Sequence, residues 1–222
     1  MMEKHKITGG IYLVLDPSME KSLLLDRLRA ALEGGVQLLQ IWDNWPIGFD
    51  KKKKSELVHS ITDIARPFEV PVLINEEWEL LLEGDLAGVH FDQIPDHYES
   101  IKEAIPSQAI VGITCGNDLK IIEWADKQRL DYISFCAMFP SSSAGECEIV
   151  SPDSIQKAKS LTDLPLFVSG GITPENISQL KELDIAGIAV ISGILSHANP
   201  KEAASIYTHA LKELENEKFT AK

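Results

Sequence analysis

Eight short apolar segments rich in β-branched residues recur along the chain, separated by segments with helical spacing of their apolar residues. Strands that alternate with helices build parallel sheets, because a parallel connection needs a crossover of a dozen or more residues. The expected strands are residues 11–15, 38–41, 70–74, 88–91, 110–114, 132–135, 166–169 and 188–191. Eight such units in 222 residues predict an α/β fold, a single-domain (β/α)8 TIM barrel.

The alternative, a doubly wound sheet, carries a glycine-rich turn after its first strand. Here the first expected strand is followed by Asp16 and Pro17, so the barrel is favoured. Each strand is expected to have a partner helix, and Ser151-Pro152 and Thr173-Pro174 each combine a capping residue with proline at the first helical position. Nothing resembling a linker divides residues 1–222, and we expect a frayed tail at 216–222.

Composition narrows the class of partner. The chain has 21 Lys and Arg against 34 Asp and Glu, a formal charge of −13 and a pI near 4.9, which disfavours nucleic acid and anionic membranes as partners. No apolar stretch approaches the roughly 20 residues of a membrane span. Three cysteines without C-x-x-C spacing, and an N-terminus without a secretory apolar segment, favour the cytoplasm.

Glycines follow the last two expected strands, as Gly170-Gly171 and as Ser192-Gly193. Catalytic groups in a barrel lie at the carboxyl ends of the strands, and phosphate sites often form after strands seven and eight. Ser169-Gly170-Gly171 and Ile191-Ser192-Gly193 lie there, so their backbone N–H groups are expected to bind a phosphate. The alternative is that each motif is only a tight turn.

Oxygen ligands follow strands three and four. Asn75 and Glu76 come directly after a buried segment, and Asp92 and Asp96 follow the next one. Mg2+ prefers such oxygen donors and often pairs one or two carboxylates with substrate phosphates. The alternative is that these acids are helix-dipole or turn residues.

Other polar residues near the expected strand ends have weaker interpretations. His90 lies within strand four, where an imidazole more often completes core hydrogen bonds than binds a metal. Cys115 and Cys136 lack an assignable His and Asp pair, so a thiol nucleophile is not favoured. The hydroxyl-rich loop 141–143 either binds phosphate or forms a plain turn, and Trp42 either stacks on a ring or packs as core.

The chain resembles the thiamine-phosphate synthase family and its relative, the thiazole tautomerase family, over nearly its whole length. The resemblance implies a TIM barrel in which 4-amino-2-methyl-5-hydroxymethylpyrimidine diphosphate loses pyrophosphate with Mg2+ assistance, while the nitrogen of thiazole phosphate captures the pyrimidine methylene. The residues that carry it are Gly34-Gly35, Gln40, residues 70–75, Gly88-Val89-His90, Asp131-Tyr132, Phe139-Pro140-Ser141, residues 169–173 and residues 191–194.

Matching the family motifs position by position assigns site residues. The catalytic set is Gln40, Asn75 and Thr114, and the metal ligands are Glu76 and Asp96. Trp42 and Asn44 stand where the family's Gln-x-Arg-x-Lys motif has its two cations, and another lysine is missing after Ser143. The tautomerase histidine corresponds to Gly116, so that chemistry is not supported. The substrate-binding set is Trp42, Asn44, Ser141, Ser143, Gly170, Gly171, Ile191, Ser192 and Gly193.

Two functional hypotheses follow. In the first, the chain is a thiamine phosphate synthase acting on small phosphorylated heterocycles, with Lys51–Lys54 or the partner subunit of a homodimer supplying the lost positive charge. In the second, it is a divergent, catalytically altered or inactive relative that binds a phosphorylated heterocycle as a sensor, carrier or tautomerase-like protein. An unrelated phosphate-binding barrel isomerase is a third and less favoured alternative.

Overall fold

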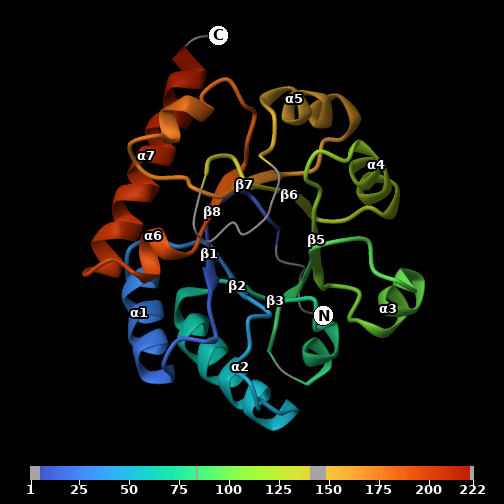
Figure 1. The fold of residues 1–222 in the computed structure, drawn as a ribbon, viewed down its shortest axis with the longest axis vertical. Helices are drawn as coiled ribbons and strands as arrows, with labels where there is room; N and C mark the ends of the chain where they lie inside the picture. The colour runs from blue at the N-terminus through green and yellow to red at the C-terminus, as the bar shows by residue number, and fades with distance from the viewer. Residues whose placement is uncertain (1–5, 84, 141–148, 221–222) are drawn as a thin grey trace.

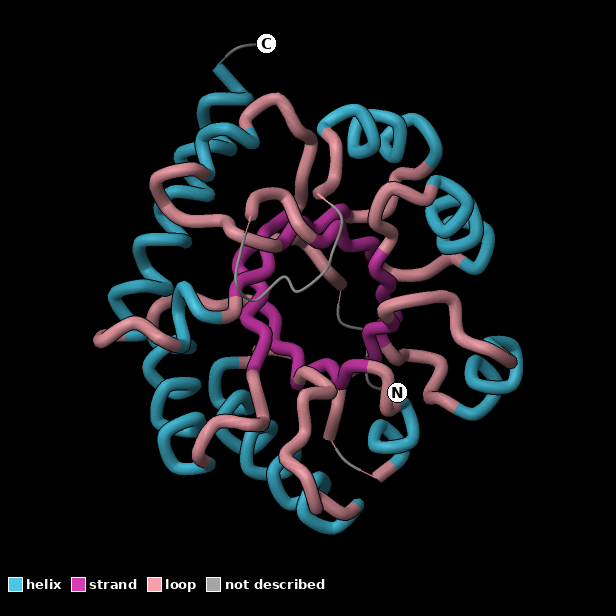
Figure 2. Tube along the Cα trace, viewed as in Figure 1, coloured by secondary structure: helices cyan, strands magenta, loops and turns pink. Residues whose placement is uncertain are grey.

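Eight parallel strands close into a barrel in the order of the chain, with helices around the outside, in the computed structural model (Figures 1 and 2). The structure describes residues 6–83, 85–140 and 149–220. The predicted (β/α)8 barrel is confirmed, and strand ends agree with the prediction to within two residues. The strands are β1 (Gly10–Leu15), β2 (Leu38–Ile41), β3 (Val72–Asn75), β4 (Gly88–Phe91), β5 (Ile110–Thr114), β6 (Tyr132–Cys136), β7 (Leu166–Ser169) and β8 (Gly187–Val190).

The helices pack their apolar faces on the outer surface of the barrel. Side chains cap several of them: Asp50 accepts the N–H of Lys53, and Ser151 accepts that of Ser154, as its position before Pro152 predicts. The last helix continues to Thr220, through most of the segment expected to be frayed. The α-helices are α1 (Lys21–Glu33), α2 (Lys51–Ala65), α3 (Tyr98–Ala104), α4 (Leu119–Gln128), α5 (Pro152–Leu161), α6 (Ser192–Leu195) and α7 (Pro200–Thr220); η1 (Arg66–Phe68), η2 (Trp78–Leu82) and η3 (Ile177–Leu180) are 3-10 turns.

The connection after β7 corrects the prediction of a helix starting at Pro174. The Asn176 side chain accepts the Thr173 N–H and donates to the Gly171 carbonyl, both at 2.8 Å, which closes a turn where the helix was expected. Only η3 follows. Likewise β3 is followed by η2, so the expectation that every strand has an α-helical partner is wrong at these two connections.

Two apolar layers hold the barrel together. The larger lies between the outer faces of the strands and the helices, and the smaller fills the barrel interior with Tyr12, Tyr132, Phe167 and their aliphatic neighbours. The three rings pack edge to face, with centroids 5.5–5.9 Å apart. Along β1, Tyr12 and Val14 point inward while Leu13 points outward, as the period of two for a strand requires. In the described ranges, no helix is long and apolar enough to cross a membrane.

Candidate active site at the barrel mouth

Parallel strands end at one mouth, and polar side chains gather there inside the barrel. Gln40 on β2, Asn75 on β3 and His90 on β4 are 6%, 1% and 4% exposed, and Thr114 on β5 is half-buried. Asn75 and His90 lie side by side in the register of β3 and β4. The structure thus brings the predicted catalytic residues Gln40, Asn75 and Thr114 to one end of the barrel.

A continuous chain of hydrogen bonds crosses the barrel beneath this mouth. The Tyr12 hydroxyl donates to Gln40 Oε1 and lies 2.8 Å from the Tyr132 hydroxyl. The Tyr132 hydroxyl lies 2.8 Å from His90 Nδ1, and His90 Nε2 lies 2.9 Å from Thr114 Oγ1. Five side chains from five strands therefore form one network, which satisfies polar groups that would be costly to bury alone.

The donor and the acceptor of each hydrogen bond in the network can be assigned. Gln40 Oε1 can only accept, so the Tyr12 hydroxyl donates its one proton to it. The Tyr12 oxygen must then accept a hydrogen bond from the Tyr132 hydroxyl. Tyr132 in turn must accept from the Nδ1–H of His90, which leaves Nε2 bare to accept the Thr114 hydroxyl proton. His90 is therefore the neutral Nδ1–H tautomer, and Thr114 Oγ1 keeps its lone pairs for a ligand at the mouth.

Burial keeps His90 neutral. It lowers the pKa of His90 from the ordinary 6.5 to about 3, because the imidazolium ion loses its hydration inside the barrel. Burial likewise raises the pKa of Tyr12 and Tyr132, so both phenols stay protonated as hydrogen-bond donors. Gly112 on β5 makes room for this arrangement, since a Cβ there would lie 2.1 Å from the Tyr132 ring.

A second feature of the mouth is a group of carboxylates. Burial raises the pKa of Glu76, and the negative charges of Asp92 and Asp43 push it in the same direction. Glu76 has a left-handed backbone, with φ of 59°, and its Oε1 accepts the Asp92 N–H at 2.5 Å. Burial and the charge of Asp43 also raise the pKa of Asp92, against a hydrogen bond from the Asn75 side chain that lowers it.

These oxygen donors fit Mg2+. Mg2+ typically uses one or two protein carboxylates and completes its shell with waters and substrate phosphates. Glu76 and Asp92 supply two carboxylates, and Asn75 Oδ1 is buried without a partner among the described residues. No group of three or more His, Cys, Asp or Glu in the described ranges could hold a metal ion, so a metal here would depend on two carboxylates together with waters and substrate phosphates. The side chains of Asp92 and the predicted ligand Asp96 are both exposed, but only Asp92 contacts Glu76, and the charges that act on Glu76 are those of Asp92 and Asp43.

The loop after β2 carries the predicted binding residues Trp42 and Asn44. Trp42 is half-buried and packs against the apolar cluster inside the barrel. The Asn44 amide donates to Asp16 Oδ1 at 3.0 Å and to Ser18 Oγ at 3.3 Å, which ties this loop to the one after β1. Asn44 is therefore a link between two loops of the mouth.

The lysine run at the start of α2 is engaged in contacts of its own. Lys54 bonds a carboxylate and lies over the Trp45 ring, 5.1 Å from its centroid. The four ammonium groups contact Glu83, Glu56, the Gly48 carbonyl and Glu77, in the order Lys51 to Lys54. In this conformation the ammonium groups of Lys51–Lys54 are bound to these partners and do not point into the mouth as free charges.

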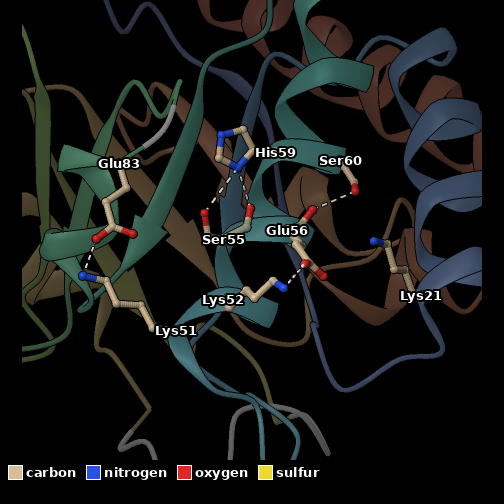
Figure 3. A pocket seen from close by; sticks show the side chains of 8 residues that line it. All are labelled: Lys21, Lys51, Lys52, Ser55, Glu56, His59, Ser60 and Glu83. Atoms are coloured by element: carbon tan, nitrogen blue, oxygen red, sulfur yellow. Dashed lines mark hydrogen bonds and ion pairs between the residues drawn. The ribbon is translucent and has the colours of Figure 1, made fainter.

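A hollow of about 840 Å³ lies beside α2 and mixes both charges (Figure 3). Figure 3 shows Lys51 bonded to Glu83 and Lys52 to Glu56, while His59 bonds back to Ser55 on its own helix. Two of its three lysines are ion-paired with its two glutamates, so the mouth, with its buried network and carboxylates, is the better candidate site. The lining residues are Lys21, Lys51, Lys52, Ser55, Glu56, His59, Ser60 and Glu83.

The loop after β7 and the start of α6 after β8 carry the residues predicted to bind a phosphate. Gly170 and Gly171 have φ of 87° and 63°, and a Cβ on Gly171 would lie 2.7 Å from two carbonyl oxygens of the loop after β6. The N–H groups of Gly171, Ser192 and Gly193 have no acceptor among the described residues. Ile191 is half-buried against the inner apolar cluster and accepts the Leu195 N–H at 3.0 Å. The two loops are thus open to accept an anion.

Some sequence predictions fall elsewhere. Ser141 and Ser143 lie outside the described residues. Burial raises the pKa of Cys115 to about 12, so it remains a thiol, in agreement with the prediction that it is not a nucleophile. Sequence reasoning did not single out Tyr12 and named Tyr132 only as part of the family resemblance, without a role. Their signal was a tyrosine at an inward position of a strand, which for Tyr132 lies opposite a glycine of the neighbouring strand.

Comparisons with known proteins identify the family of the chain. Residues 11–194 match the family described as thiamine monophosphate synthase. A thiamine-phosphate synthase of Nitrosococcus oceani is 31% identical over 89% of this chain and 90% of its own, and one of Ruminiclostridium cellulolyticum is 32% identical over 90% and 94%. The thiamine phosphate pyrophosphorylase structure from Pyrococcus furiosus shares the fold, with a TM-score of 0.79 and 19% identity over 94% of this chain and 98% of its own. The chain belongs to the thiamine monophosphate synthase family.

Proposed function

We propose that this chain joins hydroxymethylpyrimidine diphosphate to thiazole phosphate and releases pyrophosphate, which makes thiamine phosphate. The bond between the pyrimidine methylene carbon and the diphosphate oxygen breaks, and the oxygen keeps the electron pair. The lone pair of the thiazole nitrogen forms the new bond to that carbon. The observation that carries the proposal is the placing of a buried polar network and an open phosphate cradle at one mouth, in a chain of this family.

The network is suited to hold the pyrimidine ring. Gln40 Oε1 is occupied by Tyr12, so the Gln40 amide nitrogen is left to donate to a ring nitrogen. Thr114 gives its proton to His90, so Thr114 Oγ1 accepts from an amino group. A heterocycle with both an acceptor nitrogen and an amino donor matches these two groups, and Trp42 borders the same interior cluster.

The acidic side of the mouth is suited to a divalent cation. Bound Mg2+ supplies charge neutralisation for the departing pyrophosphate. We assign Glu76 and Asp92 as its protein ligands, with Asp96 tested as the alternative to Asp92. Because Trp42 and Asn44 replace the two cations of the family motif and Asp43 between them adds negative charge, the metal must carry charge that side chains supply in relatives.

The cradle is suited to the second substrate. Thiazole phosphate carries one phosphate, and the N–H groups of Gly171, Ser192 and Gly193 are directed donors that need no lysine. A cradle made of backbone fixes the phosphate in place, and thereby aims the thiazole nitrogen toward the pyrimidine side. Orientation of this kind is a large part of catalysis in a two-substrate reaction.

Pyrophosphate release tests the proposal. The purified chain is incubated with both substrates and Mg2+, and release is measured with either substrate or the metal omitted. We expect release only in the complete mixture, and a fall in kcat in Glu76→Gln and Asp92→Asn but not in the matched Asp96→Asn. Loss of kcat in Asp96→Asn alone would move the metal ligand to that residue.

The acidic mouth also favours a second candidate, a relative that binds thiazole phosphate without turnover. Asp43, Glu76 and Asp92 repel a diphosphate when no metal is bound. No pyrophosphate release, together with protection of the fold against heat by thiazole phosphate, would support this candidate and refute the first.

A further inference from the structure

Tyr207 on α7 lies outside the barrel and contacts both loops of the cradle. Its side chain is 3% exposed, and its hydroxyl donates to the Ile172 carbonyl at 3.0 Å. A Cβ on Gly193 would lie 2.3 Å from the same hydroxyl oxygen. One hydroxyl therefore bonds the loop after β7 and lies against the loop after β8. Figure 1 shows α7 beside α6 on this flank of the barrel.

Both loops need such a support because little regular structure follows them. The loop after β7 is closed by Asn176 and leads only into η3, and α6 after β8 has four residues. The backbone of Gly170 and Gly171 is in the left-handed region, which glycine enters without a steric penalty and leaves as readily. A donor fixed on a helix of 21 residues is a firm reference point for both loops.

The hydroxyl of Tyr207 is a dependable donor. Burial raises its pKa to about 12, so it is protonated at working pH. The other end of α6 has a support of its own: Arg27 Nη1 donates to the carbonyls of Leu195 at 2.7 Å and His197 at 2.6 Å. With Arg27 holding the end of α6, the position of its start depends on what Gly193 packs against, which is the Tyr207 hydroxyl and, at a greater distance, the Val190 side chain.

We propose that Tyr207 is a positioning residue for the phosphate of the second substrate. It acts through the backbone at Ile172 and Gly193, which keeps the N–H groups of the two loops converged on one phosphate. The inference rests on the proposed function for the identity of the phosphate compound.

Tyr207→Phe removes the hydroxyl and keeps the ring. Loss of one neutral hydrogen bond corresponds to about a 2- to 10-fold change in binding, so we expect KM for thiazole phosphate to rise by that factor. We expect kcat and KM for the pyrimidine diphosphate to stay unchanged. The matched control is Tyr98→Phe, a buried tyrosine on α3 that packs against Phe91 and Trp124 and should move neither KM. Equal changes in both KM values, or the same change in Tyr98→Phe, would overturn the proposal.

A second substitution tests the contact with Gly193. The Cβ of Gly193→Ala would lie 2.3 Å from the Tyr207 hydroxyl, whereas the ring carbon beneath it and Val190 Cγ1 would each lie 3.1 Å away, a distance that small adjustments relieve. We therefore expect Gly193→Ala to weaken thiazole phosphate binding strongly in the native chain and much less in the Tyr207→Phe background. Additive effects would show that the hydroxyl does not set the position of this loop.

A readout without turnover separates this inference from the proposed function. Thiazole phosphate should raise the midpoint of thermal unfolding of the native chain and of Tyr98→Phe, with a smaller rise for Tyr207→Phe at equal ligand concentration. This result would stand even if no pyrophosphate were released, in which case only the synthase proposal fails. No rise in the native chain, or equal rises in all three proteins, would refute the positioning role.

Discussion

The free energy of unfolding of this barrel should fall at acid pH because His90 is buried in its neutral form. The size of the fall follows from the shift in the pKa of His90. The pKa of His90 falls from 6.5 to about 3 on folding, so between these values the unfolded chain takes up a proton that the folded chain does not. Stability attributable to His90 is complete above pH 6.5 and is lost as pH falls toward 3. At about 1.4 kcal/mol per pKa unit, the loss is roughly 2 kcal/mol at pH 5 and roughly 3 kcal/mol at pH 4.

Urea unfolding at pH 7 and pH 5 measures this loss directly. The control is His90→Gln, whose neutral amide still forms hydrogen bonds but does not titrate in this range. Glu76 and Asp92 are present in both proteins, and their raised pKa values act in the opposite direction, because the folded chain then binds protons first as pH falls. The difference between the two proteins therefore isolates His90.

We expect the native chain to lose about 2 kcal/mol more than His90→Gln between pH 7 and pH 5. Parallel pH dependence in the two proteins would mean that the pKa of His90 is the same in the folded and unfolded chains. In that case burial would not keep His90 neutral at pH 5, and its Nε2 could not accept from Thr114 at that pH.

Two further predictions concern the mouth. Tyr132→Phe leaves Tyr12 and His90 without their shared partner, so urea unfolding should show a loss of about 1–3 kcal/mol, and a loss below measurement error would contradict a connected network. Asp43→Asn removes a negative charge that acts on Glu76 and Asp92, so the Mg2+ concentration for half-maximal activity should rise several-fold, and an unchanged or lower requirement would show that Asp43 does not contribute to metal binding.

The strands were predictable because each is a short apolar segment buried on both faces. In a closed barrel covered by helices, both the inward and outward side chains lie in apolar surroundings, so strands such as Gly187–Val190 read as continuous apolar runs. The positions of Gln40, Asn75 and Thr114 at one mouth followed from the same topology, since parallel strands all end on one side.

The turn after β7 was mistaken for a helix because local signals conflicted. Thr173-Pro174 favours a helix start, but the apolar residues that follow, Ile177, Leu180 and Leu183, are spaced by three, which is the period of a 3-10 turn. The Asn176 side chain then takes the Thr173 N–H for itself. Spacing, rather than the capping pair, was the informative signal here.

The polar network could not be predicted from local sequence. Tyr12 and Tyr132 are 120 residues apart, and only closure of the barrel brings their hydroxyls to 2.8 Å. Each reads singly as an ordinary core aromatic, and each in fact packs as one. The contact of Glu76 with Asp92 rather than with Asp96 could not be predicted from local sequence either. It depends on the left-handed backbone of Glu76, which turns the carboxylate toward the Asp92 N–H.

Formation of thiamine phosphate tests directly whether this chain is an active synthase. The purified chain, supplied with hydroxymethylpyrimidine diphosphate, thiazole phosphate and Mg2+, is followed by mass spectrometry of the product, with Glu76→Gln measured beside it. We expect the native chain to form thiamine phosphate and pyrophosphate in equal amounts, and Glu76→Gln to form them much more slowly. Absence of product from the native chain, with both substrates recovered intact, would contradict it.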